Sequence, residues 1–177
     1  MKARAVRIAL LAVLAGLGFW GWRVLFPGPE QVIRKRLNQL ASTASCSGKE
    51  GALAKLASAQ ALTSFCAPDV EIAVDVPGYS RRTFSGQDEL LQAMVAARST
   101  GRGFTVEFFD IIVTVAPDGN SAVANLTARG TASGASDVYV QELRFTLRKV
   151  QGNWLILRAE TVNTLSAPVG ATGRGSA

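Results

Sequence analysis

The stretch "LRKVQGNWLILRAETV", residues 147–162, has the most regular pattern in the chain and decides its fold class. The central "QGN" is a tight-turn sequence, and polar and apolar residues alternate around it as they do in paired antiparallel strands. On the returning strand Leu155 and Leu157 share one face, so we expect Trp154 and Ile156 on the other face. The hairpin therefore predicts an antiparallel sheet in the second half of the chain.

The sequence before this hairpin predicts further strands, and most of them follow predicted helices. Apolar residues at helical spacing predict helices, and strict alternation predicts strands. The expected helices are at 32–44, 52–65 and 85–98, and the expected strands are at 69–76, 104–115, 121–132, 137–150 and 154–162. Helices first and antiparallel strands afterwards indicate an α+β fold, with the helices on one face of a curved sheet.

Residues 1–26 form a separate segment with a basic start and an unbroken apolar run from Ile8 to Trp22. Its length is close to the ~20 residues that a helix needs to cross a bilayer. The run continues into "FWGWRVLF", which lacks a small-residue cleavage site, and Trp20 and Trp22 suit the membrane interface. We expect an uncleaved transmembrane anchor with a cytoplasmic N-terminus; a cleaved signal peptide and a buried soluble helix are the alternatives.

The net charge of +6 belongs mostly to this anchor. Four of the 19 basic residues lie in it, which leaves 15 against 13 acidic residues, or +2, for the remainder. A surface that binds nucleic acid needs a stronger field, so no nucleic-acid partner is expected. The chain has no histidine, which excludes histidine-dependent nucleophile pairs and removes the commonest metal ligand. We expect no metal and no cofactor.

The two cysteines, Cys46 and Cys66, fit a compartment in which a disulfide can persist. A straight helix between them would hold their backbones farther apart than the ~4.4 to 6.8 Å that a disulfide needs. A disulfide and two free thiols are both open at this point.

Three pieces of sequence carry a resemblance to a known superfamily: "FCAPDVEIAV", "RTFSGQDELLQAM" and "ELRFTLRKVQGNWLILRAETV". In this order they resemble the nuclear transport factor 2-like superfamily, including its polyketide cyclase (SnoaL-like) branch, over about residues 29–163. The resemblance implies a cone-shaped fold in which a curved, mostly antiparallel sheet wraps around three helices. It also implies an apolar pocket inside the cone and frequent dimerisation through the outer sheet face.

Enzymes of this superfamily place aspartates and tyrosines inside the cone, which makes Asp75, Tyr79, Asp110 and Glu142 the candidate pocket or rim residues. A carboxylate in an apolar pocket can have its pKa raised until it works as an acid or base near neutral pH. The alternative for each carboxylate is a solvated charge on a sheet face. No pair of them matches an enzyme branch, so no catalytic role is assigned and we lean towards a protein that is not an enzyme.

The strand "FFDIIVTV" predicts an interface because strict alternation gives it two apolar faces. Phe108 and Ile112 would lie on one face, and Phe109, Ile111, Val113 and Val115 on the other. A face left to water should be polar, so a second chain is expected to cover one of them. The candidate interface residues are Phe108, Ile112, Trp154 and Ile156, with a homodimer or another protein as the partner.

The sequence therefore predicts a single-pass membrane protein whose domain lies outside the cytoplasm. Its expected parts are an anchor at 1–26, a linker at 27–30, a nuclear transport factor 2-like domain at 31–163 and a flexible tail at 164–177. The expected function is binding or assembly through the sheet face. The alternative is a small-molecule enzyme of the isomerase, cyclase or hydrolase type, or a carrier of a small apolar ligand, using the pocket in the cone.

Overall fold

The computed structural model describes residues 28–75, 82–134 and 138–164, which form three helices and one six-stranded sheet. The helices are α2 (Pro29–Ala44), α3 (Ala52–Thr63) and α4 (Gln87–Ser99). The strands are β1 (Cys66–Val74), β2 (Arg82–Ser85), β3 (Phe104–Val115), β4 (Ser121–Ala132), β5 (Val138–Val150) and β6 (Asn153–Thr164).

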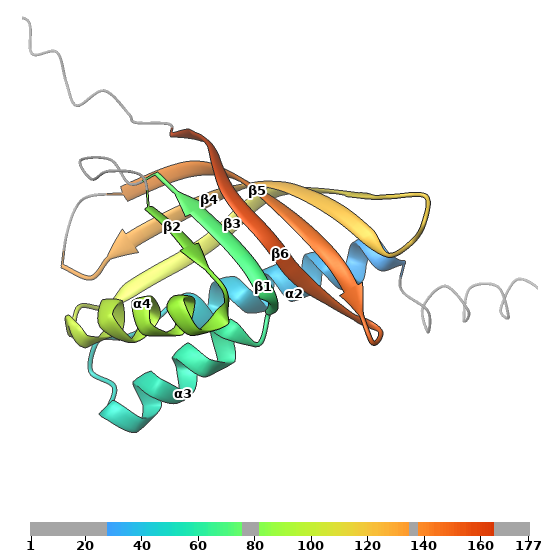
Figure 1. The fold of residues 1–177 in the computed structure, drawn as a ribbon. Coiled ribbons are helices and arrows are strands. Elements are labelled where there is room, and N and C mark those ends of the chain that lie inside the picture. Colours follow the sequence, from blue (N-terminus) through green and yellow to red (C-terminus); the bar gives the residue numbers. More distant parts are fainter. Residues whose placement is uncertain (1–27, 76–81, 135–137, 165–177) are drawn as a thin grey trace, which may run out of the picture.

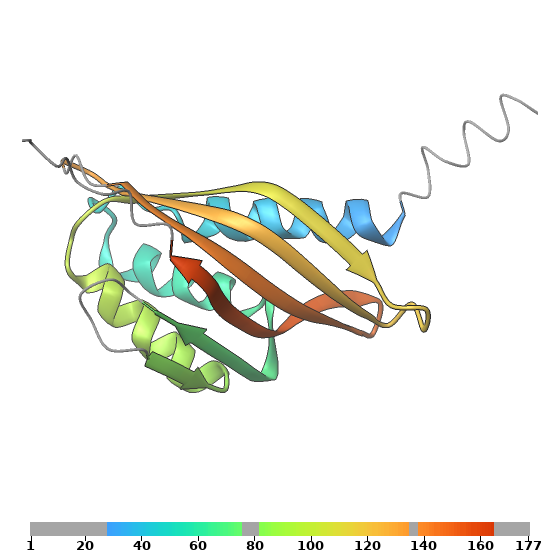
Figure 2. The same cartoon turned by 90° about the horizontal axis from the view of Figure 1, so that it is seen from above.

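The sheet has the strand order β2-β1-β6-β5-β4-β3, and it is antiparallel except where β1 runs parallel to β6. It is strongly curved, so that β3 lies beside α2 at one end while β1 and β2 lie beside α4 at the other (Figures 1 and 2). The hairpin around "QGN" joins β5 to β6, with Gln151 and Gly152 both at positive φ in the turn. The expected α+β fold with three helices and a mostly antiparallel sheet is confirmed.

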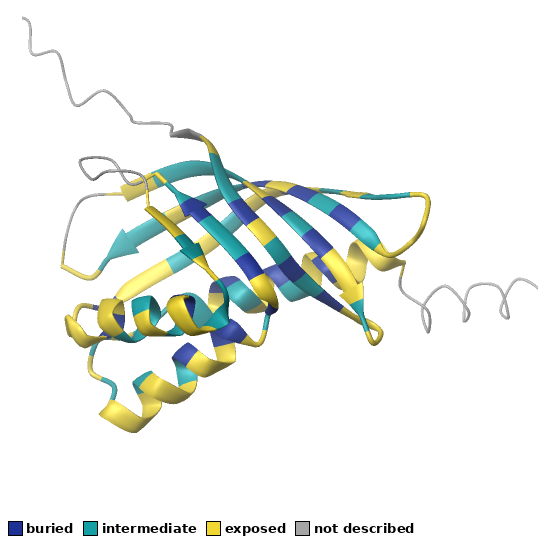
Figure 3. Ribbon diagram, in the orientation of Figure 1, coloured by how far each residue is buried: buried dark blue, intermediate teal, exposed yellow. Residues whose placement is uncertain are grey.

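The core lies between the helices and the inner face of the sheet. Helix α2 buries Ile33, Leu37 and Ala41, which recur every four residues and so share one side of the helix. Figure 3 shows the corresponding alternation of buried and exposed segments along the strands. The largest fully buried side chains are those of Ile33, Leu37, Val70 and Leu147. Helix α3 buries less, and Leu53 on it is 84% exposed.

A β-bulge interrupts β3 and changes which of its side chains face the core. The pairing of β3 with β4 shifts between Phe109 and Ile112, and Asp110 has a φ of 51°, in the left-handed region. As a result Phe108 and Ile111 both pack on the core side, whereas Phe109 and Ile112 are exposed. The expectation that Phe108 and Ile112 share a face is wrong because strict alternation has no place for the extra residue.

Several sequence expectations fall on residues outside the described ranges. The anchor at 1–26, Tyr79 and nearly all of the tail at 164–177 are among them. Across 28–75, 82–134 and 138–164, none of the helices combines the length and the hydrophobicity required to span a bilayer.

Candidate functional site

An apolar cavity of about 530 Å³ lies inside the cone. Its walls come from the three helices and from the inner face of the sheet. The apolar residues that line it are Leu40, Ala44, Leu62, Cys66, Ile72, Val74, Leu90, Met94, Phe104, Val106, Phe108, Ala128, Gly130, Leu143, Phe145, Ile156 and Ala159. Its volume falls in the range of about 300 to 1,000 Å³ that is usual for small-molecule sites.

The space exists because β4 presents small side chains to the inside of the cone. Its inward positions near the cavity are Ala128 and Gly130, while β3 contributes Phe104 and Phe108 beside them. A Cβ atom on Gly130 would lie 2.6 Å from Cζ of Phe104, so this ring rests where only glycine leaves room for it. A strand with larger inward residues would fill the cone.

Few polar groups reach this cavity. Tyr139 and Gln141 of β5 line it, and the Gln141 amide donates a hydrogen bond from Nε2 to the backbone oxygen of Asp75 over 2.7 Å. Two charged residues also contribute to the wall, but their charged groups are engaged with other side chains. Arg129 lies 3.9 Å from Glu107, and Glu160 forms ion pairs with Arg144 and Arg158.

A second cavity, of about 440 Å³, adjoins the first. The two share a wall made of Ala44, Leu62, Met94, Phe104 and Val106. The second cavity lies between the end of α2, the C-terminal half of α4 and the start of β3, and it is also lined by Cys46, Arg98 and Arg102. The cone therefore contains two adjacent apolar spaces.

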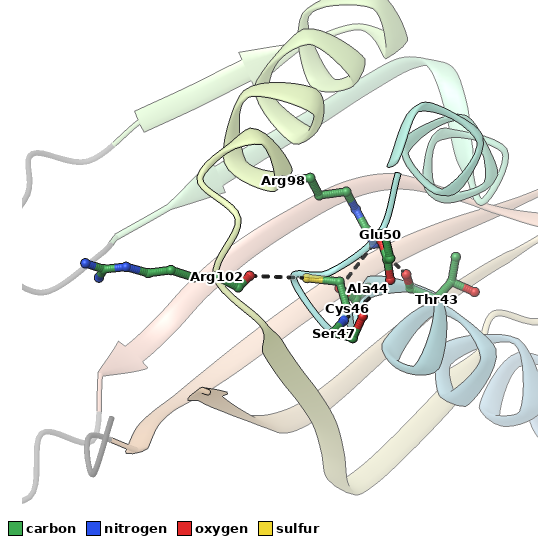
Figure 4. Close-up of polar contacts among 7 residues, drawn as sticks. All are labelled: Thr43, Ala44, Cys46, Ser47, Glu50, Arg98 and Arg102. Atoms are coloured by element: carbon green, nitrogen blue, oxygen red, sulfur yellow. Dashed lines mark hydrogen bonds and ion pairs between the residues drawn. The ribbon is translucent and has the colours of Figure 1, made fainter. Parts of the chain in front are cut away.

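Arg98 lies in the wall of the second cavity, and Figure 4 shows its polar contacts. Its side chain is only 7% exposed, and Nη2 donates to the backbone oxygens of Thr43 at 2.7 Å and Ala44 at 3.3 Å. These carbonyls end α2, so the cation also lies at the negative end of that helix dipole. Nη1 is 3.4 Å from Oε2 of Glu50. Arg98 thus ties the C-terminal ends of α2 and α4 together.

The two cysteines are free thiols, which resolves the disulfide question. Cys46 is half-buried, and its Sγ lies 3.7 Å from the backbone oxygen of Arg102 (Figure 4). Cys66 is buried and lines the first cavity. Burial raises the pKa of the Cys66 thiol to about 11, although the nearby Arg36 acts in the opposite direction. A thiol with this pKa stays protonated at neutral pH and is a weak nucleophile.

The predicted pocket carboxylates do not line either cavity. Asp75 is exposed at the end of β1, where its backbone NH donates to Oγ1 of Thr161. Asp110 and Glu142 instead line a groove on the opposite face of the sheet, together with Ile112. In the part of the chain that the structure describes, no group of three or more His, Cys, Asp or Glu side chains could hold a metal ion.

Of the four predicted interface residues, only Ile112 is exposed, at 64%. Trp154 and Ile156 are each 3% exposed and belong to the core, so their predicted place on the outer face is wrong. The ring of Phe108 packs 6.0 Å from that of Phe145, also on the core side. Ile156 pairs with Leu147 on the core face of β5, and the register shifts only after this pair, so Ala159 lies inside together with Ile156 and not with Leu157.

Sequence reasoning missed Arg98. An arginine in the last turn of an amphipathic helix is usually solvated, and the sequence around it, "VAARST", gives no sign of burial. The one available signal is the place of Arg98 at the end of its helix, where a cation can bind backbone carbonyls. This position does not reveal that the carbonyls belong to another helix, α2.

Comparison with solved structures identifies the fold as nuclear transport factor 2-like, also called cystatin-like. A nuclear transport factor 2-like protein of unknown function from Pseudomonas putida superposes with a TM-score of 0.58 at 14% identity, covering 81% of this chain and 89% of the other. A nuclear transport factor 2-like protein with a cystatin-like fold from Novosphingobium aromaticivorans gives 0.51 at 21% identity, over 72% and 79% of the chains.

The protein Aln2 from a Streptomyces species gives a TM-score of 0.57 at 17% identity, covering 77% of this chain and 92% of the other. No protein-family model matches the chain, and neither does any curated protein sequence. At these identities the likeness establishes the fold alone.

Proposed function

We propose that the domain is a non-catalytic binding module that takes a small apolar molecule into its cone. The observation that carries this proposal is the cavity of about 530 Å³ with an almost wholly apolar lining. The carboxylates of Asp75, Asp110 and Glu142 lie outside it, and that of Glu160 is paired with two arginines. A buried, unpaired carboxylate is thus lacking among the described residues that line the cone, and the buried thiol of Cys66 stays protonated at neutral pH, so proton-transfer chemistry has little support there.

The proposal includes a membrane tether, with the domain outside the cytoplasm. Its support is the sequence of residues 1–26, a basic start followed by an apolar run. Labelling of Cys46 and Cys66 by a membrane-impermeant maleimide, added to intact cells with and without denaturant, tests the location. Protection of both thiols in denatured, unpermeabilised samples would place the domain inside.

Ligand binding is best tested with alcohols of different chain length. The full chain in phosphatidylcholine nanodiscs is dialysed to equilibrium against radiolabelled octanol or decanol, and uptake by empty nanodiscs is subtracted. If the chain enters the cavity, each added methylene should tighten binding about fourfold, from ~0.8 kcal/mol per buried CH₂. Affinity that does not depend on chain length would contradict burial in the cone.

Two matched variants locate the site. Ala128→Phe places a large ring in the cavity and should abolish decanol binding, because Ala128 is an inward wall residue of β4. Ala57→Phe makes the same change at an exposed position of α3 and should leave binding unchanged. Equal binding by both variants would show that the alcohol binds elsewhere.

A second function, self-association through the outer sheet face, is favoured by exposed apolar side chains. Phe109, Ile112 and Val162 are 39%, 64% and 44% exposed, and Ile112 lies in the outer groove with Asp110 and Glu142. Sedimentation of the full chain in detergent should show a dimer that Ile112→Asp weakens. Leu53→Asp, on the exposed side of α3, is the control and should not alter it. A wild-type monomer at high concentration would refute this function.

A further inference from the structure

We infer that the molecule bound in the cone carries an anionic group, which Arg102 recognises at the rim. This inference rests on the proposed function, because it specifies the ligand of the same site. It concerns a ligand with an aliphatic body and one negatively charged end, such as a medium-chain carboxylate. Most of the charged groups around the two cavities are already engaged with protein groups.

Four charged residues line the two cavities: Arg98, Arg102, Arg129 and Glu160. Three of them are engaged with other groups. Arg98 binds two carbonyls and Glu50, Arg129 lies beside Glu107 with its guanidinium 4.9 Å from the centre of the Phe109 ring, and Glu160 lies between two arginines.

Arg102 differs from these three. Its side chain has no hydrogen bond or ion pair with any of the described residues, and it extends away from the Arg98–Glu50 cluster in Figure 4. It is exposed, and it lies two residues before Phe104, a part of the wall between the cavities. At ~3.3 Å per residue of extended chain, its Cα lies about 7 Å along the backbone from that of Phe104.

The charge of the second cavity also favours an anion. Both charged residues that line it are arginines, and the charge of Glu50 neutralises that of Arg98 but not that of Arg102. Among the described residues, Arg102 is thus left as an unbalanced cation at an exposed position on the edge of an apolar space. A ligand whose chain enters the first cavity past Phe104 would bring a terminal carboxylate within reach of this guanidinium, which binds carboxylates through two parallel N–H···O bonds. Arg102 is therefore a specificity-determining residue.

The test compares decanoate with decanol, which share a ten-carbon chain and differ in charge. Binding of each radiolabelled ligand to the full chain in zwitterionic phosphatidylcholine nanodiscs is measured by equilibrium dialysis at pH 7.5, against empty nanodiscs. We expect decanoate to bind about fivefold more tightly than decanol, the effect of one exposed ion pair. This preference should shrink between 50 and 500 mM salt, whereas decanol affinity should not fall.

Three variants make the test specific. Arg102→Gln should remove the preference for decanoate and leave decanol affinity unchanged, and Arg102→Lys should retain most of it. Arg34→Gln, at an exposed position of α2 that lines neither of these cavities, should behave as wild type.

Equal wild-type affinity for the two ligands, or a preference that survives in Arg102→Gln, would overturn this inference while leaving the cone as an apolar site. Absence of binding by both ligands would instead refute the proposed function itself. The two failures are therefore distinguishable in a single set of measurements.

Discussion

Removing the buried cation of Arg98 should cost the domain about 2 to 4 kcal/mol of unfolding free energy. The perturbation is Arg98→Met, which keeps most of the aliphatic stem and deletes the guanidinium. The hydrogen bonds from Nη2 to the carbonyls of Thr43 and Ala44 contribute about 1.5 to 3 kcal/mol, as bonds to a charged group do. The pair with Glu50, whose side chain is 26% exposed, adds about 0.2 to 1 kcal/mol.

The assay is urea unfolding of the full chain in a nonionic detergent, followed by the fluorescence of Trp154. The chain has three tryptophans, so Trp20 and Trp22 are first replaced by phenylalanine to leave the buried Trp154 as the only reporter. A single domain has about 5 to 15 kcal/mol of stability, so the variant should still fold and show a lower midpoint with an unchanged slope.

Arg102→Met is the matched control, because this arginine is exposed and should change stability by less than about 0.5 kcal/mol. A double-mutant cycle with Glu50→Gln should give a coupling of about 0.2 to 1 kcal/mol. A cost below about 1 kcal/mol for Arg98→Met, or an equal cost for Arg102→Met, would contradict the assigned role of Arg98. In either case the carbonyls at the end of α2 would not depend on Arg98.

Two further predictions concern Asp110 and Cys66. Asp110 has a φ of 51°, so Asp110→Gly should raise the unfolding free energy by up to about 1 kcal/mol, and Asp110→Val should lower it by about 1 to 2 kcal/mol, in the same urea assay. Because burial raises the pKa of Cys66 from 9.0 to about 11, the unfolded chain ionises this thiol first, and stability should fall by about 2 kcal/mol as pH rises from 9 to 11. Subtracting the pH profile of the unfolding free energy of Cys66→Ala from that of the wild type removes the contributions of all other titrating groups. A difference that does not change with pH would contradict the burial of the thiol.

The hairpin at 147–162 was sufficient to predict the class of fold, because a tight turn between alternating strands has few other solutions. The faces of its strands were harder to predict. Trp154 and Ile156 lie inside because they pair with Lys149 and Leu147, and a bulge after Ile156 then turns Ala159 to the same side, which strict alternation cannot anticipate. A single extra residue reverses the faces of everything that follows it.

The candidate site was less predictable than the fold. The cavity could have been anticipated from "SAVANLTARGTA", where every second residue from Ala122 is small except Leu126, so that the strand leaves space opposite it. The burial of Arg98 could not have been anticipated in this way, since it depends on the end of α2, 54 residues earlier in the chain. Contacts of this kind follow from the packing of helices and leave no local pattern in the sequence.

The bulge in β3 decides what chemistry the cone can perform. With strict alternation, Asp110 would share the inward face of Phe108 and place a carboxylate in an apolar space, where desolvation raises its pKa and suits it to proton transfer. The extra residue instead brings Ile111 inside, where it is 6% exposed, and leaves Asp110 on the outer face. The left-handed φ of Asp110 costs about 1 kcal/mol in a residue with a side chain, so the bulge persists because core packing outweighs this cost. One inserted residue thereby favours an apolar container over an acid–base site.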